Sequence, residues 1–327
     1  MGRRASFVIR KNGLDTYLYD RYVAGDIITS LFYGLDSALD LFDCASEDTT
    51  ILDEVWAEAG AIIDYDAKVL MFWGGDNLLD NVPFIPYIID FMETFTWKGW
   101  DVRHAKWGML SMANYLDLPG FSPCTIRQKP SEESRKYHFD WWLQSDNISR
   151  KYNDEEETII SYKKLDESLL NYTTAVELDS TLTLGEDLFK ILKDRKTAPL
   201  LHQRDVWDCL YIDEINKTIH VFWGYPLSRN SLIYELDLYW SGWQVKWIDE
   251  GYIGYLKLIG CKQDDLLFSK EEAANEVIEI VKQPIERYLT ELKQKNEPNR
   301  VKTILHWEDR LILLEKLKQE WLEKQSN

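Results

Sequence analysis

Four carboxylates in the first part of the chain suggest chemistry most directly: Glu54, Glu58, Asp64 and Asp76. Carboxyl groups act as general acid and base in hydrolases and transferases when burial raises the pKa of one of them. On an extended strand Glu54 and Glu58 would share one face, because side chains alternate along a strand. Surface carboxylates are also common on a protein of net charge −18. The sequence therefore does not exclude an enzyme, but it favours a protein without catalytic activity.

Other catalytic and cofactor signatures do not occur in the sequence. The five histidines never fall at metal-binding spacing: His104, His138, His202, His220 and His306. There is no glycine-rich phosphate loop of the GxGxxG or GxxxxGK type and no GxSxG nucleophile elbow. We therefore predict no bound metal and no cofactor.

Tryptophan is abundant, with 14 residues in the chain. Exposed aromatic rings can stack on sugars or bases. The neighbouring residues Trp141 and Trp142 are candidates for such a platform. A carbohydrate or small-ligand binder is therefore one hypothesis for function.

The negative charge is unevenly distributed along the chain. From Lys270 to the end, eleven Lys and Arg residues nearly balance twelve Asp and Glu residues, so almost all of the net charge of −18 precedes Lys270. An acidic surface repels phosphate backbones and attracts basic proteins. The apolar stretches are shorter than the roughly 20 residues needed to span a bilayer. We expect a basic protein partner, no nucleic acid and no membrane, and leave a homo-oligomer open.

The elements that would position these residues are encoded twice. The stretch 69–74 (VLMFWG) returns as 219–224 (IHVFWG), and 97–103 (WKGWDVR) returns as 240–246 (WSGWQVK). Both copies must satisfy the same fold, so residues that they share are expected to be structural. Chemistry is expected where the copies differ.

Each copy has the pattern strand, strand, helix, strand, strand, helix, strand, helix. This order predicts an α+β fold with two tandem repeats of a mostly antiparallel sheet, related by a pseudo-twofold, followed by an α-helical hairpin. Ser269 and Glu272 form the capping box expected at the start of that hairpin. The predicted segments are repeat 1 over 1–118, a crossover over 119–157, repeat 2 over 158–262 and the hairpin over 263–327.

The copies differ most visibly after the second Trp of the WxGW segment. Repeat 1 has a charged edge where repeat 2 has Gln244, Lys246, Trp247 and Asp249. We predict that this edge and the aromatic pair of the crossover bind the partner. The predicted binding residues are Asp101, Arg103, His104, Lys106, Trp141 and Trp142.

Repeat 1 also resembles a group of bacterial proteins without an assigned activity. The resemblance is carried by 1–5 (MGRRA), 52–64 (LDEVWAEAGAIID), 72–75 (FWGG) and 97–103 (WKGWDVR). It implies a bacterial, cytoplasmic protein and transfers no catalytic residues. The four cysteines, which show no CxxC spacing, also fit a reducing compartment.

These observations favour a non-enzymatic, acidic protein-binding module. It would be an immunity-type or defence-associated factor that captures a basic protein. The alternatives are a hydrolase or transferase using the carboxylates of repeat 1, and a ligand binder using exposed tryptophans.

Overall fold

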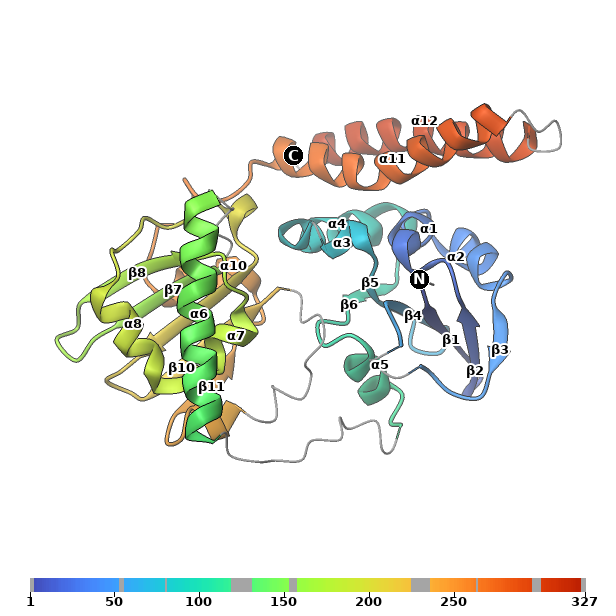
Figure 1. Cartoon of the computed structure of the whole chain (residues 1–327). Coiled ribbons are helices and arrows are strands. Elements are labelled where there is room, and N and C mark those ends of the chain that lie inside the picture. Colours follow the sequence, from blue (N-terminus) through green and yellow to red (C-terminus); the bar gives the residue numbers. More distant parts are fainter. Residues whose placement is uncertain are drawn as a thin grey trace. The chain divides into compact units, whose positions relative to one another are not determined.

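The computed structural model describes residues 3–52, 56–79, 81–118, 131–152, 158–224, 236–262, 264–295 and 301–324. The chain forms two compact units (Figure 1). Unit 1 combines Met1–Phe121 with Phe268–Asn327, and unit 2 is Ser122–Leu267. Each unit contains one β-sheet with helices, so the predicted α+β fold with two sheet repeats and a C-terminal helical hairpin is confirmed.

Unit 1 is built on a six-stranded sheet with the order β3-β2-β1-β4-β5-β6. Its strands are β1 (Ala5–Lys11), β2 (Leu14–Asp20), β3 (Ser46–Asp48), β4 (Ala59–Asp64), β5 (Val69–Gly74) and β6 (Asp101–His104). Its helices are α1 (Ile27–Leu31), α2 (Leu35–Phe42), α3 (Asp76–Leu79), α4 (Ile85–Phe91), α5 (Met109–Tyr115), α11 (Lys270–Lys295) and α12 (Val301–Lys324). Helix α5 lies on the opposite face of the sheet from α1 to α4 (Figure 1).

Unit 2 repeats this plan on a five-stranded sheet with the order β11-β10-β9-β7-β8. Its strands are β7 (Thr158–Lys163), β8 (Leu169–Thr174), β9 (Asp208–Asp213), β10 (Thr218–Trp223) and β11 (Gln244–Trp247). Its helices are α6 (Glu132–Tyr152), α7 (Leu178–Leu182), α8 (Leu188–Asp194) and α10 (Gly251–Leu258).

Both sheets are mixed, with antiparallel hairpins joined by parallel pairings. In unit 1 β1 pairs in parallel with β4, and β5 with β6. Unit 2 has the same parallel pairings, β7 with β9 and β10 with β11. Within the described residues the two units therefore match strand for strand, except that β3 of unit 1 has no counterpart in unit 2.

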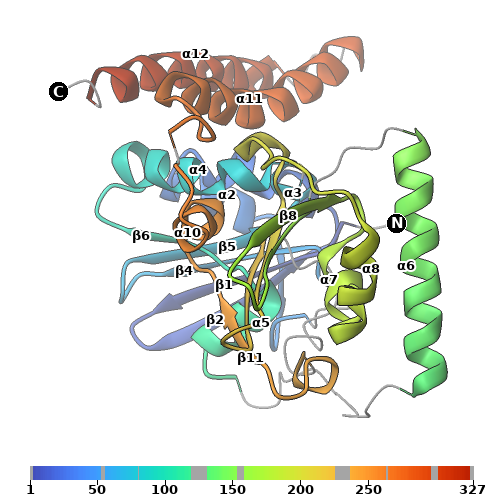
Figure 2. The ribbon, with the colours of Figure 1, turned by 90° about the vertical axis from the view of Figure 1, so that its left-hand side faces the viewer.

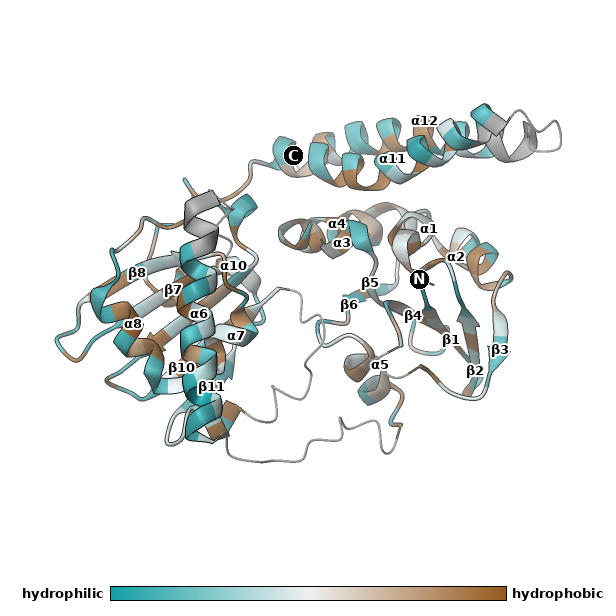
Figure 3. Cartoon of the chain, viewed as in Figure 1, coloured by the Kyte–Doolittle hydropathy of each residue, from teal (hydrophilic) through white to brown (hydrophobic). Residues whose placement is uncertain are grey.

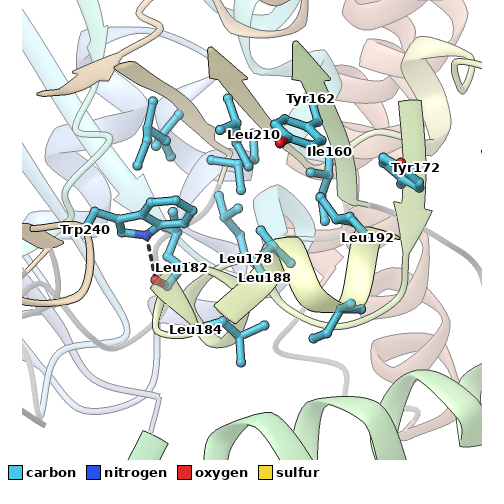
Figure 4. Close-up of a cluster of buried hydrophobic side chains, with 14 of the residues drawn as sticks. Ile160, Tyr162, Tyr172, Leu178, Leu182, Leu184, Leu188, Leu192, Leu210 and Trp240 are labelled. Atoms are coloured by element: carbon cyan, nitrogen blue, oxygen red, sulfur yellow. Dashed lines mark hydrogen bonds between the residues drawn. The ribbon is translucent and has the colours of Figure 1, made fainter. Parts of the chain in front are cut away.

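The WxGW segment forms the same corner in both units. The indole of Trp97 donates a 2.6 Å hydrogen bond to the carbonyl of Leu31, and that of Trp240 donates a 2.8 Å bond to the carbonyl of Leu182 (Figure 4). Both indoles are fully buried. The second Trp of each segment packs edge-on against the first, with ring centroids 5.2 and 5.4 Å apart. These residues thus belong to the scaffold, as their presence in both copies predicts.

One part of the predicted repeat alignment is wrong by one residue. Asp64 pairs with Val69 and Asp213 with Thr218, and Lys68 and Lys217 take the same left-handed conformation just before β5 and β10. The structural counterpart of 69–74 is therefore 218–223 and not 219–224. A one-residue shift turns every side chain of a strand to the other face, so the repeated Phe-Trp-Gly letters do not occupy equivalent positions.

The glycines that follow confirm this register. A Cβ on Gly108 would contact the ring of Trp73 at 3.3 Å, and a Cβ on Gly251 would contact the ring of Phe222 at 3.6 Å. Trp73 is thus equivalent to Phe222 and not to Trp223.

The C-terminal hairpin packs on the helices of unit 1. The predicted capping box is present, because Ser269 N donates to Glu272 Oε2 at 2.8 Å and Glu272 N donates to Ser269 Oγ at 3.2 Å. Hydrophilic and hydrophobic residues alternate along α11 and α12 (Figure 3). The indole of Trp321 donates a 3.0 Å hydrogen bond to Asp90 and packs edge-on against Phe91. The hairpin therefore packs against α4.

Within the crossover, Glu132–Tyr152 forms α6, which runs alongside α7 and α8 (Figures 1 and 2). A buried ion pair anchors this helix, with Arg195 Nη1 2.7 Å from Asp146 Oδ2. The guanidinium of Arg195 also lies over the ring of Trp142. The other parts of the predicted crossover, 119–130 and 153–157, lie outside the described residues.

The shared corner predicts a shared loss of stability. Trp97→Phe and Trp240→Phe each remove a buried indole hydrogen bond and part of a fully buried ring, so we expect each to lower the free energy of unfolding by about 1–3 kcal/mol. Urea denaturation followed by circular dichroism measures the change. Trp141→Phe, at a partly exposed ring of α6, is the control; equal losses in all three variants would contradict the shared role.

Candidate functional site

The predicted catalytic carboxylates do not converge on one place. Glu58 precedes β4 and Asp76 follows β5, so both lie at the same end of the sheet of unit 1, where Ala59 pairs with Gly74. Asp64 lies at the opposite end of β4, and a strand of six residues is about 17 Å long. Glu54 lies outside the described residues.

Asp64 has a structural role that both units share. Its Oδ1 accepts hydrogen bonds from the amides of Asp66 and Ala67, both at 2.9 Å, which holds the turn between β4 and β5. Asp213 accepts from the amides of Ile215 and Asn216 in the same way. Asp64 is therefore a turn residue, and only its 2.7 Å hydrogen bond from Tyr115 is specific to unit 1.

The charged residues predicted on and just after β6 mostly contact other residues of unit 1. Asp101 and Arg103 are exposed but pair with each other, with Arg103 Nε donating to Asp101 Oδ2 at 3.0 Å. The side chain of Lys106 is half-buried with its ammonium over the ring of Trp107, and burial lowers its pKa. The ring of His104 packs edge-on to Phe72, and its Nε2 is buried.

The aromatic pair of α6 provides no exposed platform of two rings. Trp142 is fully buried and donates a 3.0 Å hydrogen bond to Thr181 Oγ1, so its prediction as an exposed binding residue is wrong. The reason is that the amphipathic helix α6 turns this ring into the core of unit 2. Trp141 remains 40% exposed. Since α6 belongs to unit 2 and β6 to unit 1, the six predicted binding residues are spread over both units.

A different surface emerges when the two copies are compared residue by residue. Between Arg21 and Lys68 the chain contains no Lys or Arg but eleven carboxylates. The corresponding part of unit 2 carries five cations: Lys190, Lys193, Arg195, Lys196 and Arg204. The uninterrupted negative charge is therefore specific to unit 1.

Five of the exposed carboxylates of this stretch lie on α2, the turn after it and β3. Asp36, Asp40 and Asp43 are exposed and spaced by four and three residues, which places them along one side of the helix. All three residues of β3 are also exposed, including Glu47 and Asp48. We call these five carboxylates with strand β3 the acidic edge.

The central carboxylates of the acidic edge carry no compensating charge. Within the described residues, Asp43, Glu47 and Asp48 form no ion pair. Asp40 lies close enough to Arg310 of α12 to favour its charged form, although burial lowers the pKa of Arg310. The charges of Asp43, Glu47 and Asp48 are therefore not compensated by any cation of the described residues.

The sequence contained a signal for this surface that motif searching missed. No single residue of the acidic edge forms a catalytic or metal-binding pattern; the signal is the absence of Lys and Arg over a long stretch of only one copy.

Among the described residues, His, Cys, Asp and Glu side chains form no group of three or more that could hold a metal ion. Within the same part of the chain, no helix is long and apolar enough to cross a membrane.

Comparison with known proteins adds no further assignment. No protein-family model, no curated protein and no solved structure matches this chain.

The burial of His104 predicts a measurable pH dependence of stability. Burial lowers the pKa of His104 to about 4, whereas a histidine in an unfolded chain titrates near 6.5. Between these values the unfolded state binds the extra proton, so the free energy of unfolding falls as pH drops from about 6.5 to 4, by up to about 3 kcal/mol.

His104→Phe should remove this part of the pH dependence. Phenylalanine keeps an aromatic ring on β6, as Trp247 does at the equivalent position of β11, but does not titrate. Urea denaturation at several pH values between 4 and 7 measures the difference from the parent protein. His306→Phe, at an exposed site on α12, is the control, and identical pH profiles for His104→Phe and the parent would disprove the assignment.

Proposed function

We propose that this protein is a binding module that takes a basic protein partner at the acidic edge of unit 1. The observation that carries the proposal is the stretch between Arg21 and Lys68, which contains no Lys or Arg and presents the exposed carboxylates of the acidic edge. Unit 2 has the same scaffold with cations in the corresponding stretch, so the fold itself does not require this charge.

The physical basis is electrostatic attraction with little cost of desolvation. Exposed carboxylates that have no partner attract cations over a distance set by the ionic strength, about 30 Å at 0.01 M salt and about 3 Å at 1 M. Each contact between an exposed carboxylate and a Lys or Arg contributes about 0.2–1 kcal/mol. Several such contacts give specific, salt-sensitive binding and do not need a deep pocket.

A charge-neutralising variant tests the proposal. The triple variant Asp43→Asn, Glu47→Gln and Asp48→Asn removes three charges from exposed positions and keeps the polar side chains. We expect it to weaken binding of a dye-labelled decalysine peptide about tenfold in 20 mM salt, because three weak contacts are lost. Fluorescence anisotropy gives the Kd.

The matched control is Glu132→Gln, Glu133→Gln and Asp140→Asn on α6, which removes the same charge from exposed positions of unit 2. It should change the Kd by less than twofold. Equal effects of the two triple variants would show that the peptide responds only to net charge, and would refute a site at the acidic edge.

A further inference from the structure

Among the strands that the structure describes, β3 of the acidic edge is the outermost strand of its sheet. The hydrogen-bond pattern of unit 1 shows which of its backbone groups face outward. The carbonyl of Arg4 accepts from the amides of Glu58 and Ala59, and that of Arg10 accepts from Tyr65. The even-numbered residues of β1 therefore direct their backbone groups toward β4, and the odd-numbered residues direct theirs toward β2.

The same alternation fixes the direction of each backbone group in β2 and β3. Phe7 faces Leu18, so these two exchange backbone hydrogen bonds and Tyr17 and Tyr19 point their groups toward β3. Their partners Asp48 and Ser46 bond back to β2. Glu47, between them, directs its amide and carbonyl away from the sheet.

The outward backbone groups of Glu47 are open, in contrast to the other edge of the same sheet. On β6 the outward amide of Val102 donates to Glu93 Oε1 at 2.9 Å, and the outward carbonyl of His104 accepts from Lys106 N at 3.0 Å. Within the described residues, the outward amide and carbonyl of Glu47 have no hydrogen-bond partner. The short length and the negative charge of β3 protect this edge against pairing with a second copy of the chain. The strand contains neither the lysine nor the proline that would oppose a basic segment.

We propose that β3 receives an extended basic segment of the partner as an added strand, with two adjacent Lys or Arg residues opposite Glu47 and Asp48. This inference rests on the proposed function and specifies how the partner is held. Adjacent residues of a strand point to opposite faces of the sheet. Leu18 faces Glu47, and Tyr17 faces Asp48, so the two carboxylates lie on opposite faces and each requires its own cation.

The charge explains why the occupant is a basic segment and not a second copy of this chain. A second acidic edge would place like charges directly opposite each other, which is destabilising in a strand pair. In an added strand with two adjacent basic residues, the Cβ atom of each basic residue lies about 5 Å from the Cβ atom of Glu47 or Asp48 opposite it. Backbone pairing with Glu47 then supplies direction and register.

Two substitutions at one position separate the backbone contribution from the charge. Glu47→Ala removes the carboxylate and keeps the outward amide, whereas Glu47→Pro removes both. Proline is tolerated on an edge strand when its nitrogen faces outward, so the pairing of β2 with β3 should survive in both. We expect Glu47→Pro to bind the peptide Thr-Val-Thr-Lys-Lys-Thr-Val-Thr about fivefold more weakly than Glu47→Ala does, the effect of one lost hydrogen bond.

A change in the peptide gives the same test without altering the protein. N-methylation of both lysine amides preserves the charge and blocks strand pairing, so we expect it to weaken binding to the parent protein at least fivefold. If the methylated and unmethylated peptides bind equally and Glu47→Pro equals Glu47→Ala, strand addition is overturned while the proposed function stands. If neither peptide binds in 20 mM salt and decalysine does not bind either, the proposed function fails.

Discussion

The hydrogen bond from a buried indole to a helix carbonyl is the constraint on which both units depend. Trp97 and Trp240 fix the loop before the last strand to the end of α1 and α7, respectively. The approach is so close that Gly34 and Gly185 have no room for a side chain; a Cβ on Gly34 would lie 2.6 Å from the carbonyl of Thr96, and the contact at Gly185 would be tighter. Because this corner uses the most distinctive residues of the sequence for packing, function has to be sought elsewhere.

The sequence predicts the shared framework well because local and repeated patterns encode it. The hairpins, the WxGW corner and the capping box at Ser269 follow from turn chemistry, repetition and spacing. The register of β10 could not be predicted in this way, because the same Phe-Trp-Gly motif is displaced by one residue between β5 and β10. The turn before the strand sets that register, because Asp213 and the left-handed Lys217 occupy the positions of Asp64 and Lys68, and the repeated Phe-Trp-Gly letters conceal this match. The buried position of Trp142 is likewise a tertiary property, fixed by partners such as Thr181 and Arg195 far along the chain.

The comparison of the two copies also explains which part of the candidate site could be predicted. Subtracting shared residues led to β6 of unit 1, where the structure finds charges that pair internally and a histidine that packs. A comparison of where the two copies carry Lys and Arg, and not of their motifs, leads instead to α2 and β3. The charge was visible in the sequence. The open edge was not, because it depends on which backbone groups of β3 face outward, and a strand of three exposed residues has no hydrophobic alternation.

Pairing of a basic segment with the backbone of β3 should be visible in the hydrogen exchange of a single amide. The exchange of the Glu47 amide can be followed by NMR with and without the Thr-Val-Thr-Lys-Lys-Thr-Val-Thr peptide. We expect this amide, which faces outward in the free protein, to become protected in proportion to the bound fraction. The amides of Tyr17 and Tyr19, already bonded to β3, should not change. An unchanged exchange rate at Glu47 in the saturated complex would show that the peptide does not pair with β3.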